Sequence, residues 1–480
     1  MTSTESEPLP AYSFDGPEFT PLTENPIEMP GQERSDIAMN QLRQHHNIAC
    51  TQCGCVCDDL TIQRDSAGLT AVNAECPIAD QWFRAISVAP EKRVAETGGR
   101  SVSLDAAVAA AAELLKESRS PLIYGLSRSS TGGQRAACHL ADLIGATIDT
   151  TASTCHAPSI MALQSVGEAT SSLGEVRNRS DLVIYWGSDP LRTHPRHFSR
   201  IVETPGRFIP GGRSDRHVVV VDVRETASSK QADSFFCVEP GSDFEILWTL
   251  RALIKGETIV TPSVGGIDLC RLQELAERML SSRYGVVFFG LGLTDGACGH
   301  HHVEALLQLV TDLNQHTRFV ARRMRVSGDV AGADSVLCWQ TGYPFSVSLS
   351  RGFPRYNPGE FTASAMLERD EIDCAILIGA ESISRMSPAA RRCLSRIPVI
   401  LLDYAHQPAP MVPQVRFTTA IYGVHRTGVA YRMDEVPIPL RAFVDSELPS
   451  DEEVLNRIAD AVQNTFLERI RKRGHVTRPG

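Results

Sequence analysis

Cysteine is the residue whose spacing most clearly permits chemistry in this sequence. Cys50, Cys53 and Cys57 stand in one short segment, and Cys76 follows 19 positions after Cys57. Four soft thiolate ligands in so compact a stretch suit an iron-sulfur cluster. A structural zinc ion accepts four thiolates in the same spacing, and a set of buried core thiols is a third interpretation. We expect the spare thiol of the segment, Cys55, to point away or to lie in the core.

The adjacent Cys155 and His156 form a second candidate site. A single cysteine of this kind can be a nucleophile, a metal ligand or a core thiol. The strand-like segment Thr147–Thr150 precedes the pair, so we expect it at the edge of a sheet, where ligands bind in α/β proteins. A four-cysteine cluster followed by a lone thiolate at such an edge would supply an electron-transfer centre and a ligand for a redox metal.

Alternating helices and short apolar strands must position these residues. A helical pattern covers residues 105–117, and an apolar run at 121–125 ends in Gly; similar runs recur at 182–187, 218–222, 285–290, 375–379 and 399–403. A further helix, Ser242 to Lys255, opens with a capping box of Ser242 and Glu245. Buried strands separated by helices predict a doubly wound, Rossmann-like α/β fold, present twice.

Two turns after these strands could hold a ligand. They contain Gly187, Asp189, Arg192 and His194 in the first turn, and Asp222 and Arg224 in the second. A carboxylate that ends a strand can accept hydrogen bonds from a ribose hydroxyl or a guanine edge, and an arginine beside it can pair with a diphosphate. The alternative is structural, with Asp222 capping the next helix and the basic residues in a solvated loop.

Three other motifs carry less information. Three successive histidines, His300 to His302, cannot all face one ion, so they predict an exposed loop or a helix start. Gly290-x-Gly292 is only part of a dinucleotide motif. The basic run of Arg322, Arg323 and Arg325 could face a cofactor phosphate or a partner protein.

Composition bounds the class of protein. A chain of 480 residues with 42% hydrophobic residues is long enough for several domains with large cores. A net charge of -10 without long like-charge runs argues against nucleic acid or an anionic membrane as partner. No apolar run reaches the roughly 18 residues of a membrane helix, and no secretory signal precedes the cysteines, which favours the cytoplasm. Residues 1–42 are rich in Pro, Glu, Ser and Thr, which is typical of a disordered or draped arm.

Longer motifs resemble a family of molybdopterin oxidoreductases, the B subunits of formylmethanofuran dehydrogenase. The resemblance covers roughly residues 45–440. It rests on the cysteine segment running into Asp58-Asp59, on Cys155-His156-x-Pro158-Ser159, on residues 341–345 continuing to 350–360, and on residues 420–424 and 431–437. These motifs are long and occur in order.

The resemblance implies roles for individual residues. Cys50, Cys53, Cys57 and Cys76 would bind a 4Fe-4S cluster, and Cys155 would ligate tungsten or molybdenum carried by bis-molybdopterin guanine dinucleotide. His156 and Arg351 would flank that metal, with Arg355 as the alternative cation. Formate and CO2 chemistry needs a proton carrier and a fixed cation there. The turns at Gly187 and Asp222 would contact the pterin dinucleotide, as would Gly241 and Asp243, which resemble a pattern of the wider superfamily.

The resemblance also implies domains and partners. We expect an N-terminal arm (1–42), a 4Fe-4S module (43–95), a discontinuous α/β cofactor domain (96–170 plus 325–440), a dinucleotide-type α/β domain (171–324), and a C-terminal helix and tail (441–480). The C-terminal β-barrel of complete molybdopterin oxidoreductases is absent from this pattern. A small D-type subunit would therefore complete the pterin site, with A-type and C-type subunits supplying further steps of one-carbon metabolism.

Two other functions compete with the redox interpretation. In a related bacterial formyltransferase/hydrolase complex, which releases formate in tetrahydromethanopterin-linked formaldehyde oxidation, the B-type subunit can serve as a scaffold without metal chemistry. Retention of all four cluster cysteines, Cys155, His156 and Arg351 favours the metal-bearing oxidoreductase. A simple iron-sulfur electron carrier is a poorer alternative, because it needs no large α/β body.

Overall fold

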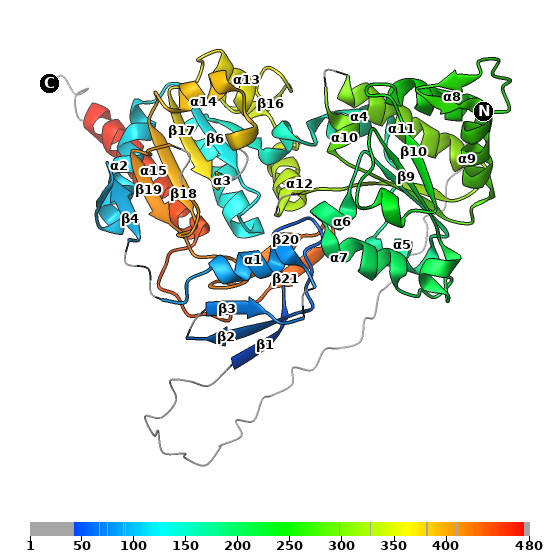
Figure 1. Ribbon diagram of the computed structural model, residues 1–480. Helices are drawn as coiled ribbons and strands as arrows, with labels where there is room; N and C mark the ends of the chain where they lie inside the picture. The colour runs from blue at the N-terminus through cyan, green and yellow to red at the C-terminus, as the bar shows by residue number, and fades with distance from the viewer. Residues whose placement is uncertain are drawn as a thin grey trace, which may run out of the picture. The chain divides into compact units, whose positions relative to one another are not determined.

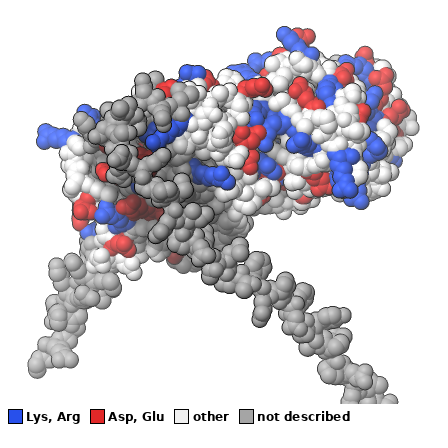
Figure 2. All heavy atoms as spheres, turned by 90° about the horizontal axis from the view of Figure 1, so that it is seen from below, with Lys and Arg blue, Asp and Glu red and all other residues white. Residues whose placement is uncertain are grey.

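The computed structural model describes residues 43–474 except residues 67, 74, 90, 92, 297, 327, 381, 382, 409 and 410, and describes side chains as far as residue 464. The arm predicted for residues 1–42 lies outside the described residues. None of the described helices is both long enough and apolar enough to cross a membrane. On the face shown in Figure 2, acidic and basic side chains are interspersed rather than gathered into a patch of one sign.

A five-stranded parallel sheet carries the turns at Gly187 and Asp222. Its strand order is β10-β9-β8-β13-β14. The strands are β8 (Leu182–Trp186), β9 (His217–Asp222), β10 (Ser234–Cys237), β13 (Gly285–Phe289) and β14 (Phe319–Arg323). Helices α4 (Ala157–Val166), α8 (Asp243–Ile254), α9 (Leu269–Ser281) and α11 (Gly299–Leu313) pack on one face, and α5 (Leu173–Arg179) with η2 (Phe198–Glu203) on the other (Figure 1). Burial on both faces explains why these strands are continuous apolar runs.

A nine-stranded sheet leads to Cys155, in the order β16-β15-β7-β6-β17-β18-β19-β4-β5. Its parallel centre consists of β6 (Pro121–Gly125), β7 (Thr147–Thr150), β17 (Cys374–Ile378), β18 (Val399–Asp403) and β19 (Val415–Thr418). Short antiparallel strands extend both edges: β15 (Val347–Ser348), β16 (Arg355–Tyr356), β4 (Ala95–Thr97) and β5 (Arg100–Ser101).

Helices cover both faces of this larger sheet as well (Figure 1). One face packs against α2 (Leu104–Glu117), α3 (Thr131–Ile144), α12 (Val330–Thr341) and the C-terminal α15 (Asp451–Gly474). The other face packs against α13 (Ala363–Glu368) and α14 (Pro388–Leu394). The apolar side chains of α15 as far as Val462 belong to the same core as the sheet, so the C-terminal helix is part of this layer.

A small antiparallel sheet holds the cysteine segment. Strands β1 (Arg43–Ile48), β2 (Leu60–Asp65) and β3 (Gly68–Ala71) pack against α1 (Pro77–Ala85). The hairpin of β20 (Gly428–Tyr431) and β21 (Pro437–Leu440), orange in Figure 1, lies beside this blue N-terminal part and shares a core with Ala49 and Val56. Residues far apart in the sequence therefore support the cysteine loop.

The remaining short elements connect these layers. They are η1 (Thr151–Thr154), α6 (Pro190–Thr193), α7 (Pro195–His197), η3 (Gly212–Asp215), η4 (Ser229–Gln231), β11 (Ser263–Val264), β12 (Ile267–Asp268), α10 (Leu291–Thr294) and η5 (Ile383–Arg385).

The predicted α/β class, with several sheets, is confirmed. Helix α8 forms where it was predicted, but the capping box is wrong: the Ser242 hydroxyl donates to the Glu239 carbonyl at 2.7 Å and caps no helical N–H. The three histidines stand at the start of α11, as expected. Contacts join residues 42–480 into one compact unit, so the predicted domain boundaries stay a prediction.

Candidate functional site

The cysteines of the N-terminal part converge on one small cavity. Cys50, Cys53, Cys55 and Cys57 come from the loop between β1 and β2, and Cys76 immediately precedes α1. Leu60, Ile78, Ala79, Pro195 and Arg196 complete the lining. We expected Cys55 to point away or to lie in the core. It lies in the core, and it also borders this cavity.

The cysteine loop is tightly wound. The Cys50 amide donates to the Cys57 carbonyl at 2.8 Å and the Val56 amide donates to the Cys53 carbonyl at 3.2 Å. Val56 has a φ of 35°, which a β-branched residue rarely adopts. Its burial against the core of the β20–β21 hairpin holds it there. Backbone strain of this kind concentrates at binding sites.

Burial and mutual contact set the protonation of these thiols. Burial raises the pKa of Cys50 well above its usual value and also raises the pKa of Cys57. A hydrogen bond between the Cys55 and Cys53 side chains lowers the pKa of Cys53 and raises that of Cys55. A cation bound in the cavity would reverse this preference, because metal binding deprotonates thiols.

The donor set fits an iron-sulfur cluster. Five cysteines line one small space, and a cluster of four irons is larger than a single ion, so its thiolates stand further apart. Among the described residues, no three His, Cys, Asp or Glu side chains are gathered tightly enough to hold one metal ion.

Cys155 and His156 lie where β7 ends. The one-turn helix η1 follows β7, Cys155 ends it, and His156 is the N-cap of α4. The half-buried Cys155 thiol donates to the Thr151 carbonyl at 3.2 Å. Burial raises the pKa of Cys155 to about 11, while Arg325 opposes that rise. The thiol is therefore protonated at neutral pH unless a cation binds it.

His156 is buried without its usual partners. Its side chain is 1% exposed, and neither ring nitrogen has a hydrogen bond of ordinary geometry among the described residues. Burial lowers the pKa of His156 well below its usual value, and Arg325 and Arg323 lower it further, although the nearby Met324 main chain opposes them slightly. Buried polar atoms normally have partners, so two orphaned nitrogens indicate a missing ligand.

Arg325 is the cation that faces this pair. It lies just beyond the end of β14, and its Nη1 donates to Asp334 at 2.5 Å. Asp334 also accepts from Thr150 Oγ1 at 2.7 Å, which ties the cation to the end of β7. The Nε atoms of Arg323 and Arg325 are buried and have no partner among the described residues. Unpaired N–H donors around a neutral imidazole can bind an anionic group.

Arg325 also connects the two candidate sites. Its carbonyl accepts from the Gly54 amide at 3.1 Å and from His194 Nε2 at 2.6 Å. A Cβ at Gly54 would stand 2.5 Å from that carbonyl, so only glycine permits this approach. One residue thus contacts the cysteine loop through its backbone and acts on Cys155 through its side chain.

The flanking role expected for Arg351 or Arg355 stays a prediction, and the two side chains differ in their surroundings. Arg351 is exposed. Arg355 donates to Ser348 and Ser350 at 3.4 Å and stacks over the Phe361 ring. The charges that act most strongly on Cys155 belong to Arg325, Asp334 and Arg385.

The turns after β8 and β13 meet at the carboxyl edge of the five-stranded sheet. Gly187 has a φ of 56°, and a Cβ there would lie 2.6 Å from the Leu293 amide nitrogen. The Gly292 amide donates to the Gly187 carbonyl at 3.0 Å. Asp189 accepts from the amide and hydroxyl of Ser228. These glycines let two backbones meet at the edge where α/β sheets bind ligands.

Some of the other candidate residues are exposed, and some are already hydrogen-bonded within the protein. Arg192, Arg224 and Gly241 are exposed, and burial raises the pKa of the half-buried Asp222. His194 is fully engaged by Thr193 and Arg325. Asp243 is buried and accepts from Trp186 Nε1 at 2.7 Å.

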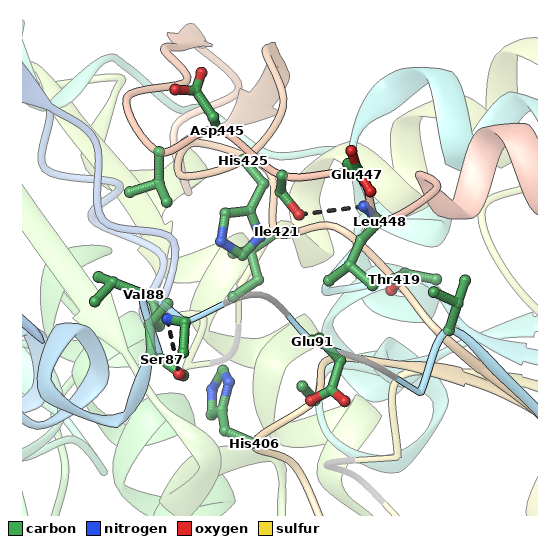
Figure 3. A pocket seen from close by; sticks show the side chains of 16 residues that line it. Ser87, Val88, Glu91, His406, Thr419, Ile421, His425, Asp445, Glu447 and Leu448 are labelled. Atoms are coloured by element: carbon green, nitrogen blue, oxygen red, sulfur yellow. Dashed lines mark hydrogen bonds between the residues drawn. The ribbon is translucent and has the colours of Figure 1, made fainter. Parts of the chain in front are cut away.

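Two further cavities lie away from all of the candidate residues. One of about 500 Å³ is walled by residues 86–89, 91, 94, 405, 406, 419, 421, 425 and 444–448, and Figure 3 shows His406 and His425 facing into it. A smaller one at the ends of β17 and β18 is lined by Arg128, Arg391 and Asp403, with Arg128 paired to Asp403 at 3.1 Å.

The sequence contained one signal for Arg325, its place in a basic run, but that run was not connected with Cys155. The basic run of Arg322, Arg323 and Arg325 ends a buried strand. Arginines that are buried need counter-ions or ligands, and these three pair with Glu435, Glu168 and Asp334. The sequence could not show that Asp334 joins Arg325 to Thr150 at the end of β7.

Curated relatives share most of the chain. The B subunit of tungsten-containing formylmethanofuran dehydrogenase 2 from Methanocaldococcus jannaschii is 38% identical over 406 residues, which are 83% of this chain and 93% of the relative. The protein of the same name from Methanococcus maripaludis is 35% identical over 87% of this chain and 98% of its own. The B subunit of the formyltransferase/hydrolase complex Fhc of Methylorubrum extorquens is 26% identical over 59% of this chain and 73% of its own. No protein-family model matches the chain.

Two solved structures share the fold. A chain of the formyltransferase/hydrolase complex FhcABCD of Methylorubrum extorquens, solved with methylofuran, superposes with a TM-score of 0.66 at 23% identity, covering 78% of this chain and 99% of that one. Acetylene hydratase from Pelobacter acetylenicus superposes with a TM-score of 0.64 at 10% identity, covering 87% and 69%. The fold, the ordered motifs and above all the identity to the two dehydrogenase subunits lead to one conclusion: the chain belongs to the family of formylmethanofuran dehydrogenase B subunits.

Proposed function

We propose that this chain is the metal-bearing subunit of a formylmethanofuran dehydrogenase, which interconverts formate and CO2 at a tungsten or molybdenum bound by bis-molybdopterin guanine dinucleotide. The observation that carries the proposal is the buried group of Cys155, His156, Arg323 and Arg325. The charge of Arg325 acts on both Cys155 and His156, and the two ring nitrogens of His156 and the Nε atoms of both arginines have no hydrogen bond of ordinary geometry among the described residues. Two relatives that match most of this chain are named tungsten-containing.

The bound metal would supply the two-electron exchange with formate or CO2. Cys155 would hold it as a thiolate, a state that Arg325 favours. Arg325 would orient a carboxylate with the N–H groups that Asp334 leaves free, because guanidinium groups bind carboxylates in a fixed geometry. Because Arg351 is exposed, we propose for it only a place at the outer side of the site.

His156 would handle the proton of the reaction. Formate oxidation releases a proton, and a neutral imidazole can accept one at Nδ1 or Nε2. The low pKa of His156 keeps its ring neutral at physiological pH. Its burial separates that ring from bulk water, so the proton must leave through neighbouring groups.

A 4Fe-4S cluster would occupy the cysteine cavity on Cys50, Cys53, Cys57 and Cys76. Gly187, Asp189, Arg192, Asp222, Arg224 and Gly241 would contact the pterin dinucleotide along the edge of the five-stranded sheet. His194 and Asp243 would support these contacts from behind, because their polar atoms are already paired within the protein.

Other subunits would complete the enzyme. We infer a small D-type subunit over the pterin, and A-type and C-type subunits that handle the formyl carrier. The solved relative is part of an ABCD complex, which supports this assembly for the present chain.

Metal analysis and one substitution test the proposal. The purified complex should contain tungsten or molybdenum, and Cys155→Ala should abolish reduction of a viologen dye by formate or formylmethanofuran while cluster absorbance persists. Cys338→Ala is a suitable control, because Cys338 is exposed on α12.

The fold shared with the Fhc complex favours one alternative, a scaffold that does no redox chemistry. A complex without tungsten or molybdenum that still releases formate from a formyl carrier would establish the scaffold function and reject the dehydrogenase. Unchanged dye reduction in Cys155→Ala would reject Cys155 as the metal ligand.

A further inference from the structure

A cation borders the cysteine cavity from another part of the fold. Arg196 stands on α7, which follows the first turn of the five-stranded sheet, and lines the cavity together with the cysteines. Its side chain is 14% exposed. The cysteine loop itself contributes no cation to this lining.

The carboxylate of Asp59 fixes the position of Arg196. Its Nη1 and Nη2 donate to the two oxygens of Asp59 at 2.6 and 2.9 Å, which is a bidentate pair. Arg200 lies 3.7 Å from Asp58 and 3.6 Å from Asp59. Burial opposes ionisation of Asp59, but Arg196 and Arg200 outweigh it and lower the pKa of that carboxyl. The guanidinium of Arg196 is therefore held in one orientation.

The same guanidinium borders the cavity beside a cysteine sulfur. Arg196 and Cys57 line one small space, and the positive charges of Arg200 and Arg196 oppose the rise that burial causes in the pKa of Cys57. Asp58 and Asp59 lie on the more exposed side, with 48% and 43% of their side chains accessible. Arg196 and Arg200 thus lie on the side of the cysteines, whereas Asp58 and Asp59 lie on the side of the solvent. Arginine stays protonated at every accessible pH, so this charge is permanent.

We propose that Arg196 tunes the iron-sulfur cluster by donating a hydrogen bond to the Cys57 sulfur, which raises the reduction potential of the cluster. The inference rests on the proposed function, in which Cys57 is a cluster ligand. Reduction adds negative charge to the cluster, and a fixed cation stabilises the more negative state. Hydrogen bonds to the sulfurs are among the main determinants of cluster potentials.

Asp59 acts in the opposite direction. Its negative charge partly neutralises the positive charge of Arg196, and its two oxygens hold the Arg196 side chain in place. Asparagine at this position keeps one hydrogen-bond acceptor for the guanidinium and removes the negative charge. The potential should therefore fall in Arg196→Gln and rise in Asp59→Asn, two shifts of opposite sign from the two halves of one ion pair.

A purely structural ion pair would behave differently. Arg196 and Asp59 also join the cysteine loop to the five-stranded part of the fold, so loss of either partner could simply loosen the loop. Loosening would change the cluster in the same way in both variants. Shifts of opposite sign distinguish tuning from docking.

The experiment is a redox titration of the purified complex, followed by the EPR signal of the reduced cluster. The signal that disappears in Cys53→Ala identifies the cluster of this chain. At the midpoint potential of the wild type, Arg196→Gln should lower the ratio of reduced to oxidised cluster at least tenfold. This change corresponds to a potential shift of about 59 mV for one electron. Asp59→Asn should raise that ratio.

Arg84→Gln is the matched control. Arg84 pairs with Asp80 at 2.8 Å on α1, in the same N-terminal part of the chain, but 59% of its side chain is exposed. The change in net charge equals that in Arg196→Gln, and solvent screens it, so the potential should not move.

The outcomes separate the inference from the function on which it rests. A wild-type complex without the Cys53-dependent signal would reject the cluster and hence the proposed function. A cluster that is present but keeps its potential in Arg196→Gln would overturn the tuning role. If Arg196→Gln loses its cluster, Asp59→Asn decides: an unchanged or lowered potential there overturns the inference.

Discussion

The buried ion pair of Arg325 and Asp334 offers the most direct test of the candidate metal site. Only 4% and 7% of the two side chains are exposed. Burial opposes the charge of Arg325, but Asp334 outweighs it and raises the pKa of Arg325; burial raises the pKa of Asp334 although Arg325 opposes it. Both charges therefore depend on each other, and Arg325→Met should leave a carboxylate without its counter-ion.

The expected cost is large for one substitution. Removing one partner of a buried ion pair typically costs about 3–5 kcal/mol. Protonation of Asp334 can offset part of this cost, because the Thr150 hydrogen bond to it remains available. Arg325→Met should therefore lower the free energy of unfolding by about 3 kcal/mol at neutral pH and by less in acid.

The pH dependence follows from the direction of the shift. Without Arg325, the folded pKa of Asp334 moves further above its unfolded value, so the native state binds more protons than the unfolded state. Stability is then highest below the unfolded pKa and is lost as the pH rises through the folded pKa. The deficit of Arg325→Met relative to wild type should grow as the pH rises from acid to neutral.

Urea unfolding of the wild type, Arg325→Met and the double variant Arg325→Met/Asp334→Leu would measure these differences. The double variant should recover most of the loss, since two apolar side chains replace two buried charges. A deficit below about 1 kcal/mol that is independent of pH, or a double variant that is less stable than Arg325→Met, would refute a tightly paired, buried cation at this position.

Three further predictions concern single residues. Burial raises the pKa of Asp329 to about 8, so wild-type stability should fall by about 2 kcal/mol between pH 6 and 8 as this proton is lost, and Asp329→Asn should flatten that slope in urea titrations at several pH values. Gly187→Ala should destabilise by at least about 1–2 kcal/mol, because alanine strains a left-handed backbone and meets the Leu293 amide; a change within 0.5 kcal/mol of zero in thermal unfolding, taken as about the error of the measurement, would contradict the close approach. In cofactor-free protein, Cys155 should react with iodoacetamide far more slowly than the exposed Cys237, since a pKa of about 11 leaves only about one thiolate in a thousand at pH 8; mass spectrometry of the two tryptic peptides would reveal equal rates if this is wrong.

The central strands could be read from the sequence because they are buried on both faces. The apolar runs at 121–125, 182–187 and 399–403 coincide with β6, β8 and β18 to within one residue. Such strands carry no polar side that could disguise them. The short edge strands β15 and β16 left no comparable signal, because two residues contain no periodic pattern.

The residues around Cys155 show where sequence reasoning ends. The cysteine and histidine were identifiable because they are adjacent and follow a strand. Their cation was not, because Arg325 follows a strand of a different sheet and is joined to the end of β7 only through Asp334 on α12. The sequence favoured Arg351, which lies in a long, recognisable motif, whereas the structure places that side chain in solvent.

Asp243 illustrates a different limit. A carboxylate at the start of a helix beyond a parallel sheet is a reasonable cofactor ligand. In the structure its Oδ1 accepts from the indole of Trp186, which is fully buried at the end of β8. A buried indole N–H needs an acceptor, so the demand of a neighbouring core residue determines the role of Asp243. Sequence spacing of 57 residues could not reveal that demand.

The shared use of Arg325 constrains how the two candidate centres can vary. Its carbonyl fixes the cysteine loop through Gly54, and its guanidinium faces Cys155. A shift of the Arg325 backbone would therefore disturb the loop and the cation together, whereas a change of the side chain alone would leave the carbonyl in place. Substitutions at position 325 should then alter the surroundings of Cys155 and leave the cysteine loop in place, whereas a side chain added at Gly54 should disturb both. The buried His194 donates a hydrogen bond to the same carbonyl and so helps to hold it in place.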